Sequence, residues 1–356
     1  MEMVDCGVNM DKVIEEDLQF ITNQKLPWSE FEGCTVLVSG ASGFLPSYMV
    51  ETLLYLNDHC EKNIKVIAIV RNEQKASEKF QHHGNRSDLE FIIQDISSPI
   101  EISEPIDYII HAASQASPRY YSIDPVGTLS ANILGTINLL KISQKNNIKG
   151  FLFFSTGGVL GRIEPSSIPA KEDDYGYIDP TDVMSCYNQS KKMAETICVS
   201  WYKQYNIPVK MVRPSYVYGP GIQLGDGRAF SNFISNITKN NPIRVIDGDR
   251  KTRSFCYIAD ATSAFFAVLL KGQDGEPYNV GVEEETSIKE LALEMVKVAA
   301  KDYDNEISYE NSFDNQRGSV DRSCFDITKI KSLGWQPKYS LSAGLKRVIN
   351  HYRGEK

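Results

Sequence analysis

Short apolar runs alternate with longer amphipathic segments along the first two thirds of the chain. The runs are rich in β-branched and aromatic residues and predict strands at residues 34–40, 65–70, 90–93, 107–113, 150–155 and 209–214. In the segments between them, apolar residues recur at helical spacing and predict helices over 47–58, 128–146 and 185–205. Strands that alternate with helices are typical of an α/β fold, in which helices cover both faces of a parallel sheet.

This pattern loosens after residue 214. Glycine, proline, aspartate and arginine become frequent in "GPGIQLGDGR" and "DGDRKTRSF", and loops of this kind often carry function on a scaffold. Residues 261–270 predict one more helix that packs on the sheet. We therefore expect an N-terminal helical arm, a main sheet domain and a smaller interleaved α/β unit, over residues 1–33, 34–214 with about 255–272, and 215–254 with 273–356.

Composition narrows the class of protein. The 356 residues are 42% hydrophobic and 24% charged, which is ordinary for a soluble globular protein. The net charge of −8 argues against a nucleic-acid surface, and no apolar stretch is long enough for a bilayer span. The acidic N-terminus is unlike a signal peptide. Seven scattered cysteines without a CxxC pair favour free thiols in a reducing cytoplasm over disulfides or a metal site.

A glycine-containing turn, "SGASGFLP", joins the first predicted strand to the first helix. Gly40 and Gly43 would let the backbone turn tightly and approach a pyrophosphate that rests on the helix N-terminus; the alternative is a plain strand-to-helix turn. Their position after the first strand of an alternating pattern favours a dinucleotide site in a Rossmann-type, doubly wound sheet. Pro46 stands where a third glycine is usual, and proline is tolerated in a first helical turn although it is bulkier.

Two residues at later strand ends bear on the nucleotide. The second strand runs into Arg71, where an acid usually binds the adenosine ribose. An arginine there suits a 2′-phosphate and hence NADP, and the alternative is a solvated surface residue. Asp95 follows the third strand and is a candidate for the adenine edge.

Candidate chemistry lies after the strand at 150–155. That strand leads into Thr156, and the long helix that follows carries Tyr187 and Lys191 four residues apart, hence on one face. A lysine beside a phenol favours the phenolate, which can take a proton from an alcohol or return one. This spacing alone is frequent by chance. Combined with a hydroxyl-ended strand in a dinucleotide fold, it predicts proton transfer coupled to hydride transfer.

With these features the chain resembles the extended short-chain dehydrogenase/reductase family of nucleotide-sugar epimerases, dehydratases and decarboxylases. The resemblance covers roughly residues 34–350 and is closest to the UDP-glucuronate decarboxylase branch. It rests on the stretches "HAASQASPRYY", "DPVGTLSANILGTINLL", "YNQSKKMAE", "YGPG", "DGRAFSNFI", "TRSFCYIAD" and "DITKIKSLGWQP". It implies that the smaller unit binds a nucleotide sugar.

The resemblance also implies a role for each site residue. Tyr187 is the acid/base, Lys191 holds the nicotinamide ribose, and Thr156 hydrogen-bonds the sugar hydroxyl that is oxidised. The implied cofactor contacts are Gly40, Ser42, Gly43, Phe44, Leu45, Arg71, Asp95, Ile96, Ala112, Ala113, Ser114, Tyr187, Lys191 and Pro214. The implied substrate contacts are Ser117, Arg119, Thr156, Gly157, Arg228, Val245, Arg253 and Arg317. The arginine fork suits phosphate oxygens, and the alternative for each arginine is surface charge.

One stretch departs from the decarboxylases and 4,6-dehydratases, which carry a glutamate two residues after the threonine. Here "STGGVLG" places Gly157 and Gly158 after Thr156. Hydride transfer at C4 needs Tyr187, Thr156 and a nicotinamide, whereas elimination needs a further acid and base. A second departure is Tyr216, where relatives usually carry asparagine near the diphosphate.

We therefore predict an NAD(P)-dependent ketoreductase or epimerase that acts at C4 of a nucleotide-linked sugar, in the synthesis of polysaccharide or glycoconjugate precursors. The alternatives are a decarboxylase that uses another acid and a catalytically idle NAD(P)-binding sensor or scaffold. NADP or NAD is the expected cofactor, and no metal, nucleic acid or membrane partner is expected. Apolar residues on more than one face of the helices near 128–146 and 187–205 predict a homodimer, as in the family.

Overall fold

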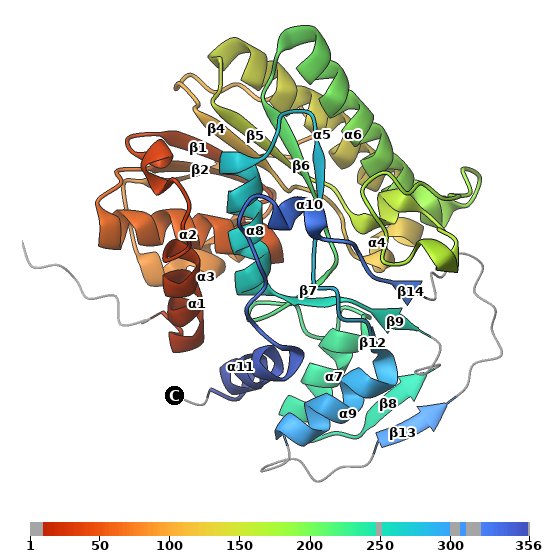
Figure 1. Cartoon of the computed structure of the whole chain (residues 1–356). Coiled ribbons are helices and arrows are strands. Elements are labelled where there is room, and N and C mark those ends of the chain that lie inside the picture. Colours follow the sequence, from red (N-terminus) through yellow and green to blue (C-terminus); the bar gives the residue numbers. More distant parts are fainter. Residues whose placement is uncertain (1–9, 247–250, 300–306, 311–321, 355–356) are drawn as a thin grey trace, which may run out of the picture.

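The computed structural model of the chain describes residues 10–246, 251–299, 307–310 and 322–354. Its central sheet is parallel throughout, in the order β11-β6-β5-β4-β1-β2-β3 (Figure 1). The strands are β1 (Thr35–Ser39), β2 (Lys65–Val70), β3 (Leu89–Ile93), β4 (Tyr108–His111), β5 (Gly150–Phe154), β6 (Val209–Pro214) and β11 (Pro277–Val280). The order reverses between β1 and β4, which confirms the predicted doubly wound fold.

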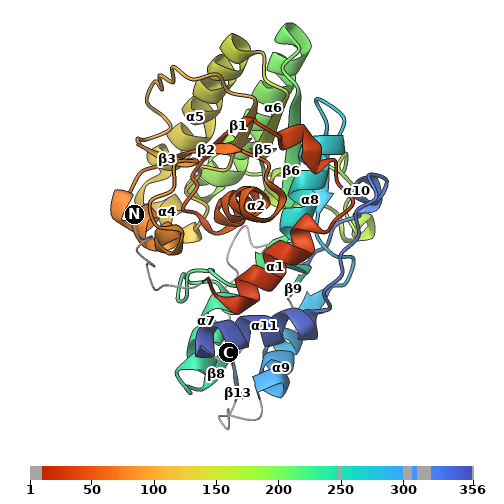
Figure 2. The same cartoon turned by 90° about the vertical axis from the view of Figure 1, so that its left-hand side faces the viewer.

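Helices cover both faces of this sheet, as the alternating pattern predicts. One face packs against α5 (Pro125–Asn146) and α6 (Cys186–Tyr205), and the other against α2 (Phe44–Cys60) and α8 (Ile258–Lys271) (Figure 2). The helix predicted at 261–270 is α8, whose side chains are almost all buried. Each face has its own apolar cluster, so the sheet lies between two cores.

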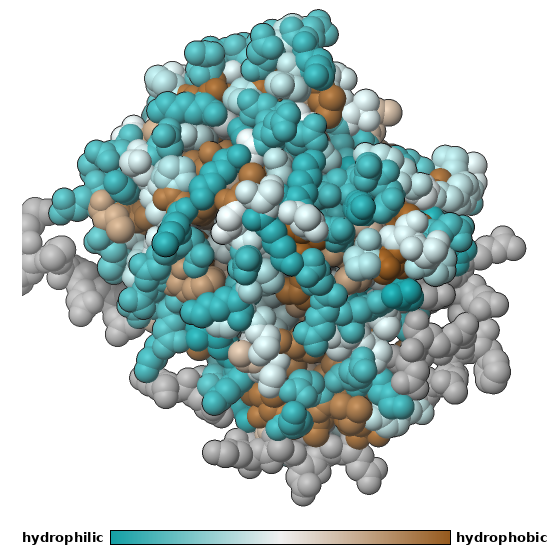
Figure 3. Space-filling view, in the orientation of Figure 1, coloured by the Kyte–Doolittle hydropathy of each residue, from teal (hydrophilic) through white to brown (hydrophobic). Residues whose placement is uncertain are grey.

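The smaller lobe lies beyond the carboxyl edge of the sheet. Its described residues include the helices α7 (Ala229–Thr238), α9 (Ile288–Ala299) and α11 (Leu341–Arg353). Its short strand pairs include β8 (Ile243–Ile246) with β13 (Ile307–Glu310), and β7 (Tyr216–Tyr218) with β10 (Phe255–Tyr257). A three-stranded sheet is formed by β12 (Thr286–Ser287), β9 (Thr252–Arg253) and β14 (Arg322–Ser323). Figure 3 shows the face of the molecule seen in Figure 1, which is largely hydrophilic and has apolar patches over the smaller lobe.

One predicted boundary needs correction. Residues 273–356 were assigned to the smaller unit, but β11 pairs with β6 as an edge strand of the central sheet. The strand has only four residues and begins with a proline, so its sequence carries little alternation that would predict a strand. The chain therefore returns to the main sheet after α8 before it completes the smaller lobe.

The predicted N-terminal arm contains α1 (Lys12–Thr22), which packs on α2 and α8. Its Asp17 is fully buried and accepts hydrogen bonds from the hydroxyls of Tyr48 (3.2 Å) and Tyr257 (2.7 Å). Arg347 of α11 donates to the same carboxylate at 2.8 Å. The arm thus joins the sheet domain to the C-terminal helix through one buried carboxylate.

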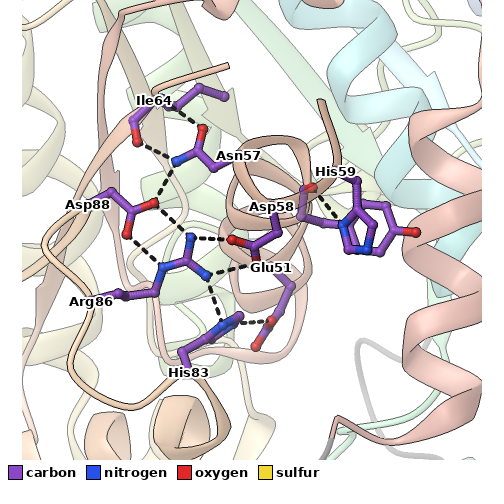
Figure 4. A network of polar contacts seen from close by, with 9 residues as sticks. Glu51, Asn57, Asp58, His59, Ile64, His83, Arg86 and Asp88 are labelled. Atoms are coloured by element: carbon purple, nitrogen blue, oxygen red, sulfur yellow. Dashed lines mark hydrogen bonds and ion pairs between the residues drawn. The ribbon is translucent and has the colours of Figure 1, made fainter. Parts of the chain in front are cut away.

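A second polar network closes the turn between α2 and the strands β2 and β3 (Figure 4). Arg86 binds Asp88 through Nε at 2.6 Å and Asp58 through Nη2 at 2.9 Å, and its Nη1 faces Nδ1 of His83 at 3.2 Å. Nε2 of His83 lies 2.7 Å from the buried carboxylate of Glu51. Both ring nitrogens of His83 therefore have partners, and the network fixes the edge of the sheet domain.

In the described part of the chain, no helix combines the length and apolar character that a bilayer span requires.

Candidate active site

A cavity of about 1040 Å³ opens at the carboxyl edge of the central sheet. Gly40 and Gly43 line it from the turn after β1, and Ala112 to Ser114 line it from the turn after β4. These turns flank the point where the strand order reverses, which is where ligands bind in open α/β sheets. The opposite wall comes from the smaller lobe, through residues that include Lys251, Arg253, Arg322 and Phe325.

The turn after β1 has the shape that the glycine pattern predicts. Gly40 has φ +70°, and a Cβ on it would lie 2.7 Å from Cα of Ala113. Gly43 is the N-cap of α2 and makes no side-chain capping bond, while Phe44, Leu45 and Pro46 from the first turn of α2 line the cavity. An uncapped helix N-terminus beside a tight glycine turn fits a pyrophosphate. The buried hydroxyls of Ser114 and Ser215, which also line the cavity, have no hydrogen-bond partner among the described residues.

Tyr187, Lys191 and Thr156 come together at the cavity wall formed by β5 and α6. The Thr156 hydroxyl accepts the backbone N–H of Gly158 at 3.2 Å, which orients it. Burial raises the pKa of Tyr187 to about 12, although a hydrogen bond with Thr156 and the charge of Arg228 oppose the shift. The hydroxyls of Tyr187 and Thr156, both predicted from the sequence, can therefore contact the same ligand oxygen in the cavity.

Lys191 is only 1% exposed, and its Nζ donates to the carbonyl oxygen of Phe154 at 2.6 Å. The ammonium also lies 4.7 Å from the ring centroid of Phe153. Burial lowers the pKa of Lys191 to about 7, because a dry environment disfavours the charged form. The end of β5 thus fixes the lysine directly beneath the turn that carries Thr156.

Sequence reasoning missed a second tyrosine at the site. Tyr121 lies in the loop and short helix α4 (Pro118–Ile123), and its ring stacks on that of Tyr187 with centroids 5.1 Å apart and planes 11° apart. Its hydroxyl donates to the carbonyl oxygen of Ala116 at 3.0 Å. The only sequence signal was its place in "SPRYY", one of the stretches that carry the resemblance.

Other side chains fill the space beside the two glycines after Thr156. A Cβ on Gly157 would collide with the Phe325 ring, whose Cε2 is 2.7 Å away. A Cβ on Gly158 would lie 2.7 Å from Cγ of Asn188. Neither glycine has a positive φ, so the constraint is steric contact and not a left-handed backbone. Phe325 and Asn188 both line the cavity, and neither was predicted as a site residue.

Cationic side chains gather on the smaller-lobe side of the cavity. Arg228 pairs with Asp226, and the Arg253 guanidinium lies 5.1 Å from the ring centroid of Tyr216. Both arginines line the cavity, as do Gly157 and Pro214. Arg317 lies outside the described residues. Arginine side chains at this wall suit an anionic group such as a diphosphate.

Several predicted contacts lie away from the cavity wall. Arg71 and Asp95 face each other at 3.8 Å and are about half exposed. Ile96 and Val245 are buried in apolar clusters with exposures of 3% and 1%, because their hydrophobic side chains complete the cores. Ser42, Ser117 and Arg119 do not line the cavity either, although their neighbours Gly43, Ala116 and Pro118 do.

The sequence profile of the NAD dependent epimerase/dehydratase family matches residues 36–281, which is more than half of the chain. The chain belongs to this family. UDP-glucuronic acid decarboxylase 2 of Arabidopsis thaliana is 32% identical over 334 residues, which cover 93% of this chain and 71% of the relative. UDP-glucuronic acid decarboxylase 1 of Danio rerio is 30% identical and covers 98% of this chain and 80% of its own length.

Solved structures of the family share the fold. UDP-glucose 4-epimerase from Thermotoga maritima, solved with UDP-glucose, has a TM-score of 0.76 at 24% identity and covers 90% of this chain and 99% of its own. UDP-glucuronic acid 4-epimerase from Bacillus cereus, solved with UDP-glucuronic acid and NAD, has a TM-score of 0.74 at 24% identity, with the same coverage of both chains. The family match, together with the cavity at the switch point, makes that cavity the candidate active site.

Proposed function

We propose that the protein is an NAD(P)-dependent enzyme that acts at C4 of a nucleotide-linked sugar, as a ketoreductase or an epimerase. The observation that carries this proposal is the meeting of Tyr187, Thr156 and Lys191 at the switch point, beside a turn that holds no carboxylate at residue 158. Gly40 and the uncapped start of α2 would hold the dinucleotide pyrophosphate. When bound, the nicotinamide supplies the acceptor or donor of the hydride.

The chain's own residues would manage the proton. Tyr187 takes the proton of the C4 hydroxyl during oxidation and returns it during reduction, while the Thr156 hydroxyl holds the same oxygen. Lys191, fixed by Phe154, stabilises the tyrosinate through its positive charge. Arg228 and Arg253 would bind the diphosphate across the cavity, because both line its far wall.

A decarboxylase is the second candidate, because the sequence relatives named above are UDP-glucuronic acid decarboxylases. We favour the reductase or epimerase because the position of the branch's glutamate is Gly158, over which an uncharged amide lies. Removal of carbon dioxide through that position would need a group that donates and accepts protons there.

The test is a screen of UDP-, GDP-, CDP- and dTDP-sugars, including 4-keto-6-deoxy forms, with NAD and NADP. Products are identified by mass spectrometry and NMR, since an internally recycled cofactor changes no net absorbance. A product altered at C4 with all carbons retained is the expected result. Release of carbon dioxide and UDP-xylose from UDP-glucuronate at ordinary enzyme rates would instead establish the decarboxylase.

We also propose a homodimer through α5 and α6. Val126, Leu134 and Met193 on these packed helices are 69%, 47% and 54% exposed, which leaves apolar surface for a partner. Light scattering should give twice the mass of the chain, and Leu134→Glu with Met193→Glu should give one chain. Leu293→Glu, at an exposed leucine on α9, is the matched control and should remain a dimer.

A further inference from the structure

The space above Gly158 belongs to the side chain of Asn188. Asn188 lies in the first turn of α6, directly after Tyr187. Its Cγ and Nδ2 lie 2.7 and 3.1 Å from the point where a Cβ on Gly158 would be. The amide therefore occupies the volume into which a side chain at residue 158 would extend, and such a side chain would have to displace it.

The amide of Asn188 is free to meet a ligand. It lines the cavity and is half-buried, and its side chain has no hydrogen-bond partner among the residues that the structure describes. The amide of buried Gln115, by contrast, is committed, because it donates to Asp124 at 2.9 Å and accepts from the Thr128 hydroxyl at 3.4 Å. A polar group held close to a cavity wall without a protein partner is expected to bind water or substrate.

Its position is tied to the reacting groups by two short links. Asn188 is the next residue to Tyr187 along α6, and it covers Gly158, whose N–H donates to the Thr156 hydroxyl at 3.2 Å. A ligand oxygen held by both Tyr187 and Thr156 would therefore have a neighbouring substituent within reach of the amide.

We infer that Asn188 is a specificity-determining residue that hydrogen-bonds a neutral hydroxyl or carbonyl oxygen on a sugar carbon next to C4. The inference rests on the proposed function, which places C4 at Tyr187 and Thr156. An amide donates and accepts hydrogen bonds but does not titrate near neutral pH, whereas a carboxylate at the same place would exchange protons. Asn188 thus orients the sugar and adds no second acid or base. Phe325, which fills the space above Gly157, supplies an uncharged wall beside it.

The alternative is that Asn188 only fills space, and an isosteric variant separates the two roles. Asn188→Asp keeps the shape but introduces a titratable group. If the amide binds substrate, kcat/KM of the variant falls as pH rises through the carboxyl pKa, because the ionised group can no longer donate. The wild type shows no such ionisation at this position. A space-filling role leaves the pH profile of Asn188→Asp parallel to that of the wild type.

Truncation measures the size of the contact. With the nucleotide sugar that the screen finds active, Asn188→Ala should lower kcat/KM about 5- to 100-fold, as expected for the loss of a hydrogen bond to a buried polar group. NAD affinity should stay within about twofold of the wild type, as expected for a residue away from the cofactor. Gln189→Ala, at the next position of α6 and outside the cavity wall, is the matched control and should keep wild-type kcat/KM.

The steric part of the inference has a readout that does not depend on any substrate. Gly158→Ala should lower Tm in the wild-type background and lower it clearly less in the Asn188→Ala background, because the collision is removed. Equal losses in both backgrounds would overturn the shared-space argument. If no nucleotide sugar in the screen binds or reacts, the proposed function is wrong and this inference falls with it. If the wild type is active and both Asn188 variants retain its kcat/KM and pH profile, only this inference is wrong.

Discussion

The cavity has two adjacent walls that are built in opposite ways. On one wall, Tyr187, Lys191 and Thr156 are functional side chains held by buried partners, such as the 2.6 Å bond from Lys191 to Phe154. On the other, Gly157 and Gly158 carry no side chains, and Phe325 and Asn188 from other elements fill the space. The hydroxyl of Thr156 thus lies only two residues from position 158, where the chain has no carboxylate.

Under the proposed function, this difference separates the proton transfer that the chain carries out from the elimination that it lacks. Proton transfer at one oxygen needs only a hydroxyl, a phenol and a nearby cation, all of which are present. Elimination needs a further acid and base, and at the wall where relatives place that group the Asn188 amide fills the space beside Gly158. An acid installed at residue 158 would therefore have to displace the Asn188 amide. Changes to the first wall should affect turnover, and changes to the second should first affect stability and fit.

The largest expected effect is on turnover at the first wall. Tyr187→Phe keeps the ring and its stack on Tyr121 but removes the proton, so kcat should fall roughly 100- to 10,000-fold with the active nucleotide sugar. NAD or NADP affinity should survive in titration calorimetry. Tyr205→Phe, near the far end of the same helix, is the control. Turnover of Tyr187→Phe within threefold of the wild type would remove Tyr187 from the mechanism.

Lys191 should make the stability of the free protein depend on pH. Its folded-state pKa of about 7 lies below the usual lysine value of 10.5. Burial of the ammonium therefore costs stability fully below pH 7, and the cost disappears as pH rises towards 10.5. Lys191→Met removes this cost. The gain in the free energy of unfolding of Lys191→Met over the wild type should therefore be about 2–4 kcal/mol larger at pH 6 than at pH 10.

Urea unfolding of the cofactor-free protein at the two pH values measures this difference. Lys192→Met, at the neighbouring half-buried lysine, is the control and should show little pH-dependent difference. A relative stability of Lys191→Met that does not change with pH would mean that the lysine is not titrating in a dry site.

The contrast between the two walls also marks what the sequence could predict. The strands and the Tyr187–Lys191 pair follow from local spacing, because strand alternation and helical periodicity repeat within a few residues. Phe325 reaches Gly157 from 168 positions away in the chain, as their numbers show, and no local pattern encodes that contact. Val245 was assigned to substrate but is buried, since a contact inferred from a family position says nothing of which way this side chain packs. The edge strand β11 was missed for the related reason that its pairing partner is distant.

The second wall can be tested through its packing. Gly157→Ala should lower the unfolding free energy by about 1–3 kcal/mol, because the added methyl meets the Phe325 ring in a filled site. Phe325→Leu in the same chain should recover part of that loss by making room. Gly225→Ala is not used as a control because Gly225 has a φ of +72°. Ala229→Gly on α7 is used instead, and it measures the effect of exchanging glycine and alanine away from the Phe325 contact. Full additivity of Gly157→Ala and Phe325→Leu would contradict the contact.

The smallest expected effect concerns cofactor choice by Arg71 and Asp95, which follow β2 and β3 and lie away from the cavity wall. Arg71 is 55% exposed on its side chain and lies 3.8 Å from Asp95. We expect the Arg71 guanidinium to turn from Asp95 to the 2′-phosphate of NADP. Arg71→Ala should therefore weaken NADP binding about tenfold and leave NAD binding nearly unchanged. The effect is no larger because an exposed charge pair contributes little to binding.

Asp95 supplies the opposing test of that choice. Its carboxylate would repel the 2′-phosphate of NADP, whereas Arg71, with which it is paired, would attract that phosphate. Asp95→Asn should therefore strengthen NADP binding severalfold in calorimetry, whereas Lys75→Ala, at an exposed cation on the neighbouring α3 (Glu73–Phe80), should change neither cofactor. The solved Bacillus cereus relative holds NAD, so a wild-type preference for NAD, together with weaker NAD binding in Asp95→Asn, would assign the ribose to Asp95 and leave Arg71 as its surface partner.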